Sequence, residues 1–78
     1  MGNLNQIVVI GLPGDFAEDP EKFFSQGAGY PPVCCYFVPG SNAWFVNFET
    51  EKAASRTAAS FNGSLVLGKW EVKAGVVA

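Results

Sequence analysis

The chain of 78 residues contains no histidine, and this absence excludes much chemistry. Without histidine, neither a Ser-His-Asp nor a Cys-His catalytic arrangement can be assembled, and the commonest metal ligand is missing. Gly11-Leu12-Pro13-Gly14 could form a turn, but no Lys-Ser/Thr follows it, so it does not make a phosphate-binding loop. The sequence therefore predicts no enzyme, no metal site, no cofactor and no small-molecule substrate.

Long apolar runs are also missing. No stretch approaches the roughly 18 apolar residues of a membrane-spanning helix, and the N-terminus lacks a charged segment followed by an apolar one. We expect no contact with a membrane. The length fits one domain over residues 1–78, with no room for a second core. Its tight ends predict that this domain is a piece of a longer protein.

Cysteine is scarce, with two residues that are adjacent in the sequence. Cys34 and Cys35 fall in a predicted strand, so their side chains should point to opposite faces of a sheet. This arrangement disfavours a disulfide between them, and the pair is not a Cys-x-x-Cys motif. Unpaired cysteines predict a reducing compartment and hence an intracellular protein.

Cations are few, and the net charge is −2. Nucleic-acid-binding domains are more often basic, because neutralised phosphates supply much of their affinity. Acidic residues gather before and within the start of the first expected helix, where they serve the helix dipole. Four of the five cations come after residue 51. The charge therefore weakens an RNA-binding interpretation without excluding it. The clustered acids are Asp15, Glu18, Asp19 and Glu21, and the late cations are Lys52, Arg56, Lys69 and Lys73.

Two helix patterns alternate with four strand patterns. Asp19 can cap a helix that has Pro20 at its first position, and Thr50 can cap a second helix that Asn62-Gly63 ends. Ala54, Thr57, Ala58 and Phe61 form the apolar stripe of this second helix. The expected strands cover residues 6–10, 33–38, 43–48 and 69–77; the helices run from Pro20 to before Gly27 and over residues 51–61.

This order predicts an α+β fold, a ferredoxin-like βαββαβ sandwich. Right-handed crossovers place both helices on one face of a four-stranded antiparallel sheet with strand order 4-1-3-2. The other face of the sheet stays open to solvent. That open face is the only broad surface that the fold leaves for function.

Two segments and a corner carry a family resemblance over roughly residues 5–74. Residues 7–12 read Ile-Val-Val-Ile-Gly-Leu, residues 41–48 read Ser-Asn-Ala-Trp-Phe-Val-Asn-Phe, and the corner is Phe61-Asn62-Gly63. This pattern resembles the RNA recognition motif family, as a divergent member. The family stacks unpaired bases on three aromatic positions of its central strands. The resemblance assigns these positions to Val8, Ala43 and Phe45, of which only Phe45 is aromatic.

The rest of the resemblance bears on fold and partner. The spacing from Phe48 to Asn62-Gly63 and Gly68-Lys69 follows the family and supports the fold. One protein-binding branch of the family carries an Arg-x-Phe signature just after the second helix. Here that place reads Ser64-Leu65-Val66, so the chain does not resemble this branch.

The turn at residues 39–42 predicts the register of the central hairpin. Residues whose numbers sum to 81 should face each other, which places Tyr36 opposite Phe45 and Cys34 opposite Asn47. Such an aromatic pair could also merely stabilise the sheet. Trp44, Val46 and Phe48 should point into the helices, while Trp70 is expected to be core. The open face is expected to carry Val8, Ile10, Tyr36, Ala43, Phe45, Asn47, Glu71 and Lys73.

Two functions remain open. The first is weak binding of single-stranded RNA by a domain of an RNA-processing or RNA-regulatory protein. Phe45 and Tyr36 would stack on bases, Asn47 would hydrogen-bond a base edge, and Val8 and Ala43 would complete the surface, with Lys73 and Lys69 attracting phosphates. The alternative is a protein–protein interaction module, hetero- or homotypic, that uses the sheet or the helices and joins an RNA-processing complex.

Overall fold

The computed structural model describes residues 5–77. These residues form two helices and six strands in the order β-α-β-β-α-β-β-β. No helix among them is long and apolar enough to cross a membrane. The elements are β1 (Gln6–Ile10), α1 (Pro20–Ser25), β2 (Cys34–Val38), β3 (Ala43–Asn47), α2 (Glu51–Phe61), β4 (Leu65–Val66), β5 (Trp70–Glu71) and β6 (Lys73–Val76).

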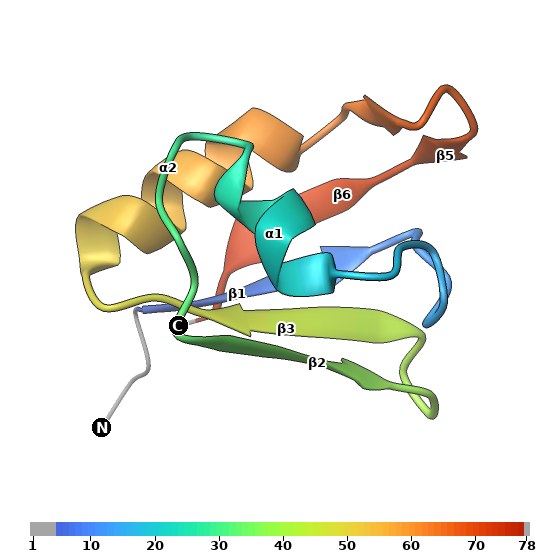
Figure 1. Cartoon of the computed structure of the whole chain (residues 1–78), viewed down its shortest axis with the longest axis horizontal. Coiled ribbons are helices and arrows are strands. Elements are labelled where there is room, and N and C mark those ends of the chain that lie inside the picture. The colour runs from blue at the N-terminus through green and yellow to red at the C-terminus, as the bar shows by residue number, and fades with distance from the viewer. Residues whose placement is uncertain (1–4, 78) are drawn as a thin grey trace.

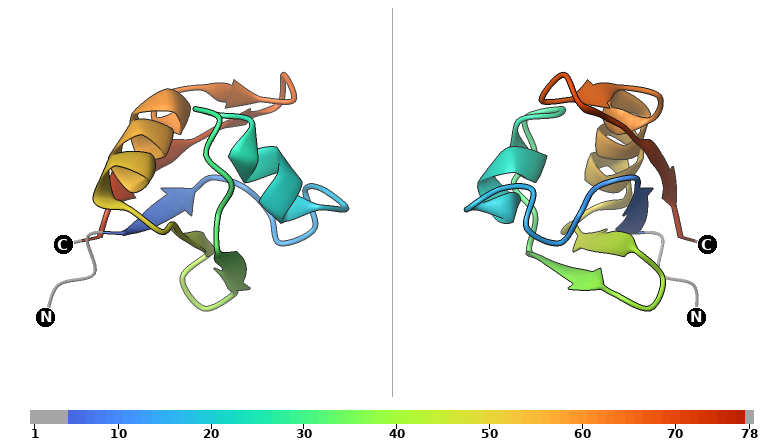
Figure 2. Two further views of the ribbon diagram at one scale, coloured as in Figure 1. Left: turned by 60° about the vertical axis from the view of Figure 1, so that its left-hand side comes forward. Right: turned by 90° about the vertical axis from the view of Figure 1, so that its right-hand side faces the viewer.

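The main sheet has four antiparallel strands in the order β2-β3-β1-β6. Both helices pack against one face of this sheet (Figure 1; Figure 2). Because β6 is the fourth strand of the sheet along the chain, this is the predicted order 4-1-3-2. The α+β, ferredoxin-like fold class is confirmed, and within residues 5–77 the opposite face of the sheet carries no helix.

The helix boundaries follow from their caps. The Asp19 carboxylate accepts a hydrogen bond from the Lys22 backbone N–H at 3.1 Å, and Pro20 begins α1. The Thr50 hydroxyl accepts one from the Ala53 N–H at 3.1 Å. Helix α2 ends at Phe61 with Asn62 as its C-cap, and the Asn62 side-chain Oδ1 accepts a hydrogen bond from the Ala74 N–H on β6. This last contact ties the end of α2 to the sheet.

The core lies between the sheet and the helices and is rich in aromatic rings. Trp44, Phe48 and Phe61 are buried there, as predicted. The Trp44 ring packs with the Phe16, Phe24 and Phe37 rings at centroid distances of 5.5, 5.9 and 5.6 Å. Its indole Nε1 donates a hydrogen bond to the Pro13 carbonyl at 3.0 Å. Trp44 therefore joins β3, α1 and the loop after β1.

The prediction of the last strand, over residues 69–77, is wrong in its first half. Instead of one strand over residues 69–77, the chain forms a small β4–β5 hairpin and then β6. The two strands separate at Val72, which is fully buried and exchanges backbone hydrogen bonds with Gly63 and Ser64. Leu67 and Gly68 form the hairpin turn, both with positive φ. Glu71 therefore pairs with Leu65 in this hairpin and is not part of the four-stranded sheet.

The Thr57 hydroxyl on α2 is buried and has no hydrogen-bond partner among the described residues. An unsatisfied buried polar group costs about 1–3 kcal/mol, and valine keeps the shape of threonine without the hydroxyl. We therefore expect Thr57→Val to raise the free energy of unfolding by about 1 kcal/mol in urea titrations. Thr57→Ser, which keeps the hydroxyl and loses a methyl group, should lower it. A destabilised Thr57→Val protein would show that the hydroxyl does have a partner.

Candidate functional site on the open sheet face

Strand pairing sets four residues in one row across the centre of the open face. Tyr36 on β2 lies opposite Phe45 on β3, Phe45 opposite Val8 on β1, and Val8 opposite Gly75 on β6. The hairpin register predicted from the turn is thus confirmed. The neighbouring row ends at Lys73, which lies opposite Ile10. The structure therefore brings Tyr36, Phe45, Val8 and Lys73 together on one surface.

The Tyr36 and Phe45 rings are stacked at this surface. Their centroids are 5.6 Å apart and the ring planes are inclined by 21°. Tyr36 is 46% exposed, and Phe45 is half-buried. The Gln6 side-chain Nε2 donates a hydrogen bond to the Tyr36 hydroxyl at 3.1 Å, which holds the phenol ring in place. Sequence reasoning did not identify Gln6, because its contact depends on the pairing of β1 with β3.

Beside the aromatic pair the surface is hollowed. A shallow depression of about 140 Å³ is lined by Val8, Ile10, Lys73, Ala74 and Gly75. Gly75 contributes to it because no atom lies within 4 Å of the position that a Cβ would occupy. Ile10 is 45% exposed. The face thus offers an aromatic pair, an apolar depression and one ammonium group at its edge.

Two of the predicted site residues are less accessible than expected. Ala43 lies in register on the open face, but its side chain is only 2% exposed, so it supports the surface from beneath. Asn47 is half-buried, and its Nδ2 donates a hydrogen bond to the Cys34 Sγ at 3.2 Å. Its Oδ1 is buried without a partner among the described residues. The acceptor of the Asn47 amide is therefore closed to a ligand, while Nδ2 keeps a second N–H beside its bond to Cys34.

Two charged residues that the sequence placed on the open face or at the RNA site lie outside the four-stranded sheet. Glu71 is on β5, where it pairs with Leu65 of the hairpin and not with a strand of the four-stranded sheet. Lys69 is in the loop of the β4–β5 hairpin, and its Nζ lies 4.8 Å from the centroid of the Trp70 ring. The other cations, Lys22, Lys52 and Arg56, are exposed on the helices. Lys73 is therefore the cation that the four-stranded sheet places at the site.

The two thiols differ in surroundings, and both are free. Cys34 is exposed beside Asn47. Cys35 packs against the core on the other face, as the alternation predicts. Burial raises the pKa of the Cys35 thiol to about 11, and the nearby Glu21 carboxylate adds to this rise. Cys35 therefore stays a protonated, unreactive core thiol at neutral pH. Within residues 5–77, no group of three or more His, Cys, Asp or Glu residues could hold a metal ion.

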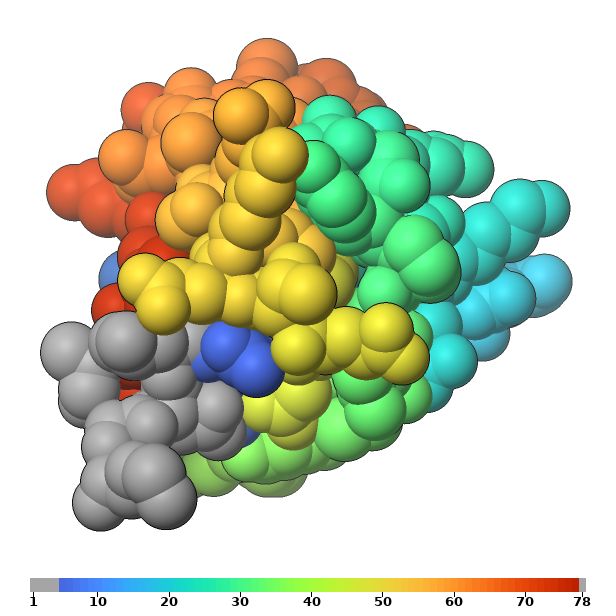
Figure 3. Space-filling model, turned by 90° about the vertical axis from the view of Figure 1, so that its left-hand side faces the viewer, coloured from blue at the N-terminus to red at the C-terminus, as the bar shows by residue number. Residues whose placement is uncertain are grey.

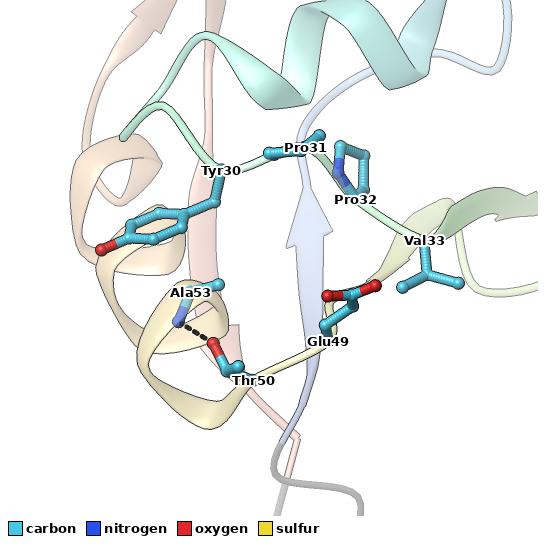
Figure 4. A pocket seen from close by; sticks show the side chains of 7 residues that line it. All are labelled: Tyr30, Pro31, Pro32, Val33, Glu49, Thr50 and Ala53. Carbon is cyan, nitrogen blue, oxygen red and sulfur yellow. Dashed lines mark hydrogen bonds between the residues drawn. The ribbon is translucent and has the colours of Figure 1, made fainter.

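A separate groove of about 390 Å³ lies away from the open face, between the α1–β2 loop and the start of α2. Figure 3 shows the side of the molecule on which these two segments meet. In Figure 4 the Glu49 carboxylate is directed toward Pro31 and Pro32, with the Tyr30 ring at one end and Val33 at the other. Sequence reasoning missed this groove, because its walls come from two segments that only the fold brings together.

Comparison with known proteins connects this geometry to one fold. No protein-family model matches the chain, and no curated protein is significantly similar to it in sequence. Solved structures do match. A complex of two RRM domains is similar with a TM-score of 0.74 and 15% identity, over 95% of this chain and 86% of the other.

Two further structures are similar. In the PID-3 TOFU-6 RRM domain complex, the match covers 95% of this chain and 92% of the other, with a TM-score of 0.70 and 15% identity. In the C. elegans NONO-1 homodimer the TM-score is 0.76 with 19% identity, but this chain spans only 29% of that chain. The strand order, the two helices on one face of the sheet and the open opposite face agree with the fold of these structures. The chain therefore has the fold of an RNA recognition motif.

Proposed function

We propose that this domain binds single-stranded RNA weakly through the open face of its sheet. The observation that carries this proposal is the Tyr36–Phe45 stack at the centre of the face, with Tyr36 exposed, Phe45 half-buried and Lys73 at its edge. Unpaired bases stack on such rings because every base has a flat π face. Tyr36 and Ile10 are 46% and 45% exposed on this face, and exposed apolar surface of this kind marks contact with a partner.

The expected affinity is low. One aromatic stack contributes about 1–3 kcal/mol, so two stacks supply about 2–6 kcal/mol. A Kd of 1 mM corresponds to about 4.1 kcal/mol and 1 μM to about 8.2 kcal/mol. With one cation at the four-stranded sheet, little further energy comes from phosphates. We therefore expect a Kd in the tens of micromolar or weaker.

Backbone amide shifts during an RNA titration test the proposal. A pool of short unpaired oligonucleotides should shift the amides of β1 and β3 and those of Lys73 and Gly75. The amides of α2 should move little, because this helix covers the opposite face (Figure 1). Absence of shifts on β1 and β3 at millimolar RNA would refute RNA binding by this face.

A second candidate function is binding of a partner protein, and the Tyr30–Val33 groove favours it. The groove offers apolar walls from Tyr30, Pro31, Pro32 and Val33, the last 59% exposed. An extended apolar segment of a partner could lie there without touching the sheet face. In the same NMR experiment, a protein partner from an RNA-processing complex would shift the backbone amide signals of residues 30–33 and of the first turn of α2. RNA bound to the open face would leave these amide signals unchanged.

A further inference from the structure

The two edges of the four-stranded sheet differ in what covers them. At the β6 edge, the Asn62 Oδ1 accepts a hydrogen bond from the Ala74 N–H. Just before β6, Gly63 and Ser64 exchange backbone hydrogen bonds with Val72, so the end of α2 closes this side. Strand β2 is the outer strand at the other edge, and among residues 5–77 it pairs with β3 alone. The free side of β2 therefore presents backbone N–H and C=O groups that no other strand uses.

Strand β2 also lacks the features that protect outer strands. Such strands usually carry a lysine, a proline or a bulge that prevents pairing with another chain. Residues 33–38 read Val-Cys-Cys-Tyr-Phe-Val and contain neither a charge nor a proline. The β2–β3 pairing is one residue to one residue throughout, so it contains no bulge. Pro32 and Pro39 bound this segment, and proline has no N–H to donate to a sheet. The open edge is thus a short, uncharged segment with defined ends.

The Tyr30–Val33 groove begins where this edge begins. Val33 directly precedes β2, lines the groove and is 59% exposed. Glu49 lines the same groove, with its carboxylate directed toward Pro31 and Pro32 (Figure 4). A peptide segment that follows the edge of β2 toward its start therefore reaches the groove and the Glu49 carboxylate.

The surroundings of this edge are acidic. Five of the seven acidic residues but only one of the five cations, Lys22, come before residue 51. Burial and then the Glu21 carboxylate raise the pKa of the Cys35 thiol, and Asp19 adds to this rise. Both carboxylates therefore lie close to β2, on the helix side of the sheet. Together with Glu49 in the groove, they favour a partner that carries positive charge.

We propose that the outer edge of β2 binds an extended segment of a partner protein as a fifth strand, and that a lysine or arginine beyond this strand pairs with Glu49. Antiparallel pairing is the more stable arrangement, and it places the C-terminal end of the segment beside Val33. The cation therefore follows the paired residues. Next to Cys35 and Phe37, which pack on the core, the segment has apolar side chains. This proposal rests on the second candidate function, whose partner it defines, and is independent of RNA binding.

The test begins with a display library of random ten-residue peptides that is selected on the full chain. The enriched peptides should share an uncharged stretch of about six residues, followed on its C-terminal side by lysine or arginine. In NMR titrations they should shift the backbone amides of β2 and of residues 30–33, and should slow hydrogen exchange along the free side of β2. The amides of β6, at the far edge of the sheet, should not move.

N-methylation of the enriched peptides distinguishes strand addition from a simple apolar contact. In an added strand, the N–H groups of alternate residues point toward β2, and those of the intervening residues point away. Methyl groups on the first set should weaken binding at least about tenfold, because two or three hydrogen bonds are lost. Methyl groups on the second set should change the Kd little.

Substitutions in the chain test the two parts of the site. Glu49→Gln should weaken binding of an arginine-containing peptide about two- to fivefold and leave its glutamine analogue unaffected, while Glu71→Gln on the distant hairpin changes neither. An equal loss for both peptides would refute the ion pair. Val33→Lys places a charge at the edge and should weaken binding of both peptides. Leu65→Lys is its control, because Leu65 is also exposed but lies on the β4–β5 hairpin.

The outcomes separate strand addition from the candidate function on which it rests. If enriched peptides shift residues 30–33 but not β2, or if both N-methylation patterns weaken binding equally, strand addition is refuted and protein binding in the groove stands. If no peptide is enriched, or if the enriched peptides shift neither region, both fail together. RNA binding by the open face is decided separately, by the amides of β1 and β3.

Discussion

Replacement of Trp44 by alanine should remove most of the stability of this domain. The Trp44 side chain is only 5% exposed, contacts three aromatic rings and donates a hydrogen bond to Pro13. Truncation of a buried tryptophan to alanine costs about 3–5 kcal/mol, through lost burial and the cavity that remains. A chain of this length is stable by about 4–12 kcal/mol. We expect Trp44→Ala to be largely unfolded, or to unfold at much lower urea concentrations, in circular dichroism titrations.

Two further substitutions serve as controls. Trp44→Phe keeps a ring in the core and loses the indole donor, so its cost should be intermediate. Phe45→Ala, at the next residue on the opposite face, loses mainly the cross-strand pair with Tyr36, which is worth about 0.2–1 kcal/mol. A cooperatively folded Trp44→Ala protein with stability near that of the parent would contradict the register of β3.

Much of this fold could be predicted from local signals. Thr50 and Asn62-Gly63 set the limits of α2, because cap chemistry is local in the sequence. The four-residue turn after Val38 fixed the register of the central hairpin, and the alternation of Trp44 and Phe45 then assigned each ring to its face. In these places one short segment determines the geometry.

The features that could not be predicted depend on distant segments. The β4–β5 turn places Leu67 at φ 53°, where asparagine or glycine is usual, so its residue type gave no turn signal. Gly63 and Ser64 form backbone hydrogen bonds with Val72 between β5 and β6, and Glu71 thus belongs to the hairpin and not to the four-stranded sheet. The burial of Ala43 and the Tyr30–Val33 groove likewise depend on neighbouring segments that sequence patterns do not place at this detail.

Replacement of Phe45 by alanine should abolish most of the RNA affinity that the sheet possesses, with little loss of fold. Phe45 lies at the centre of the face and stacks on Tyr36, so its removal deletes one base platform and loosens the other. Loss of one stack at about 1–3 kcal/mol corresponds to roughly 5- to 150-fold weaker binding. The Kd from amide shifts should rise by this factor, while the urea midpoint changes little.

Phe45→Leu distinguishes RNA stacking from a general apolar contact. Leucine keeps most of the apolar surface and has no π face, so an RNA site should lose nearly as much affinity as with alanine. A protein partner that covers the same patch should tolerate leucine, because burial of apolar area does not require a flat ring. Phe45→Trp should bind RNA at least as well as the parent chain.

The salt dependence provides a second, independent measure of the same interface. Each phosphate contact with single-stranded nucleic acid contributes about −0.7 to the slope of log K against log salt. Lys73, the cation at the four-stranded sheet, predicts a slope near −0.7. Phe45→Ala should weaken binding without changing this slope, because stacking releases no counterions. A slope that collapses together with the affinity would show that Phe45 acts by positioning Lys73, and the stacking mechanism would then be wrong.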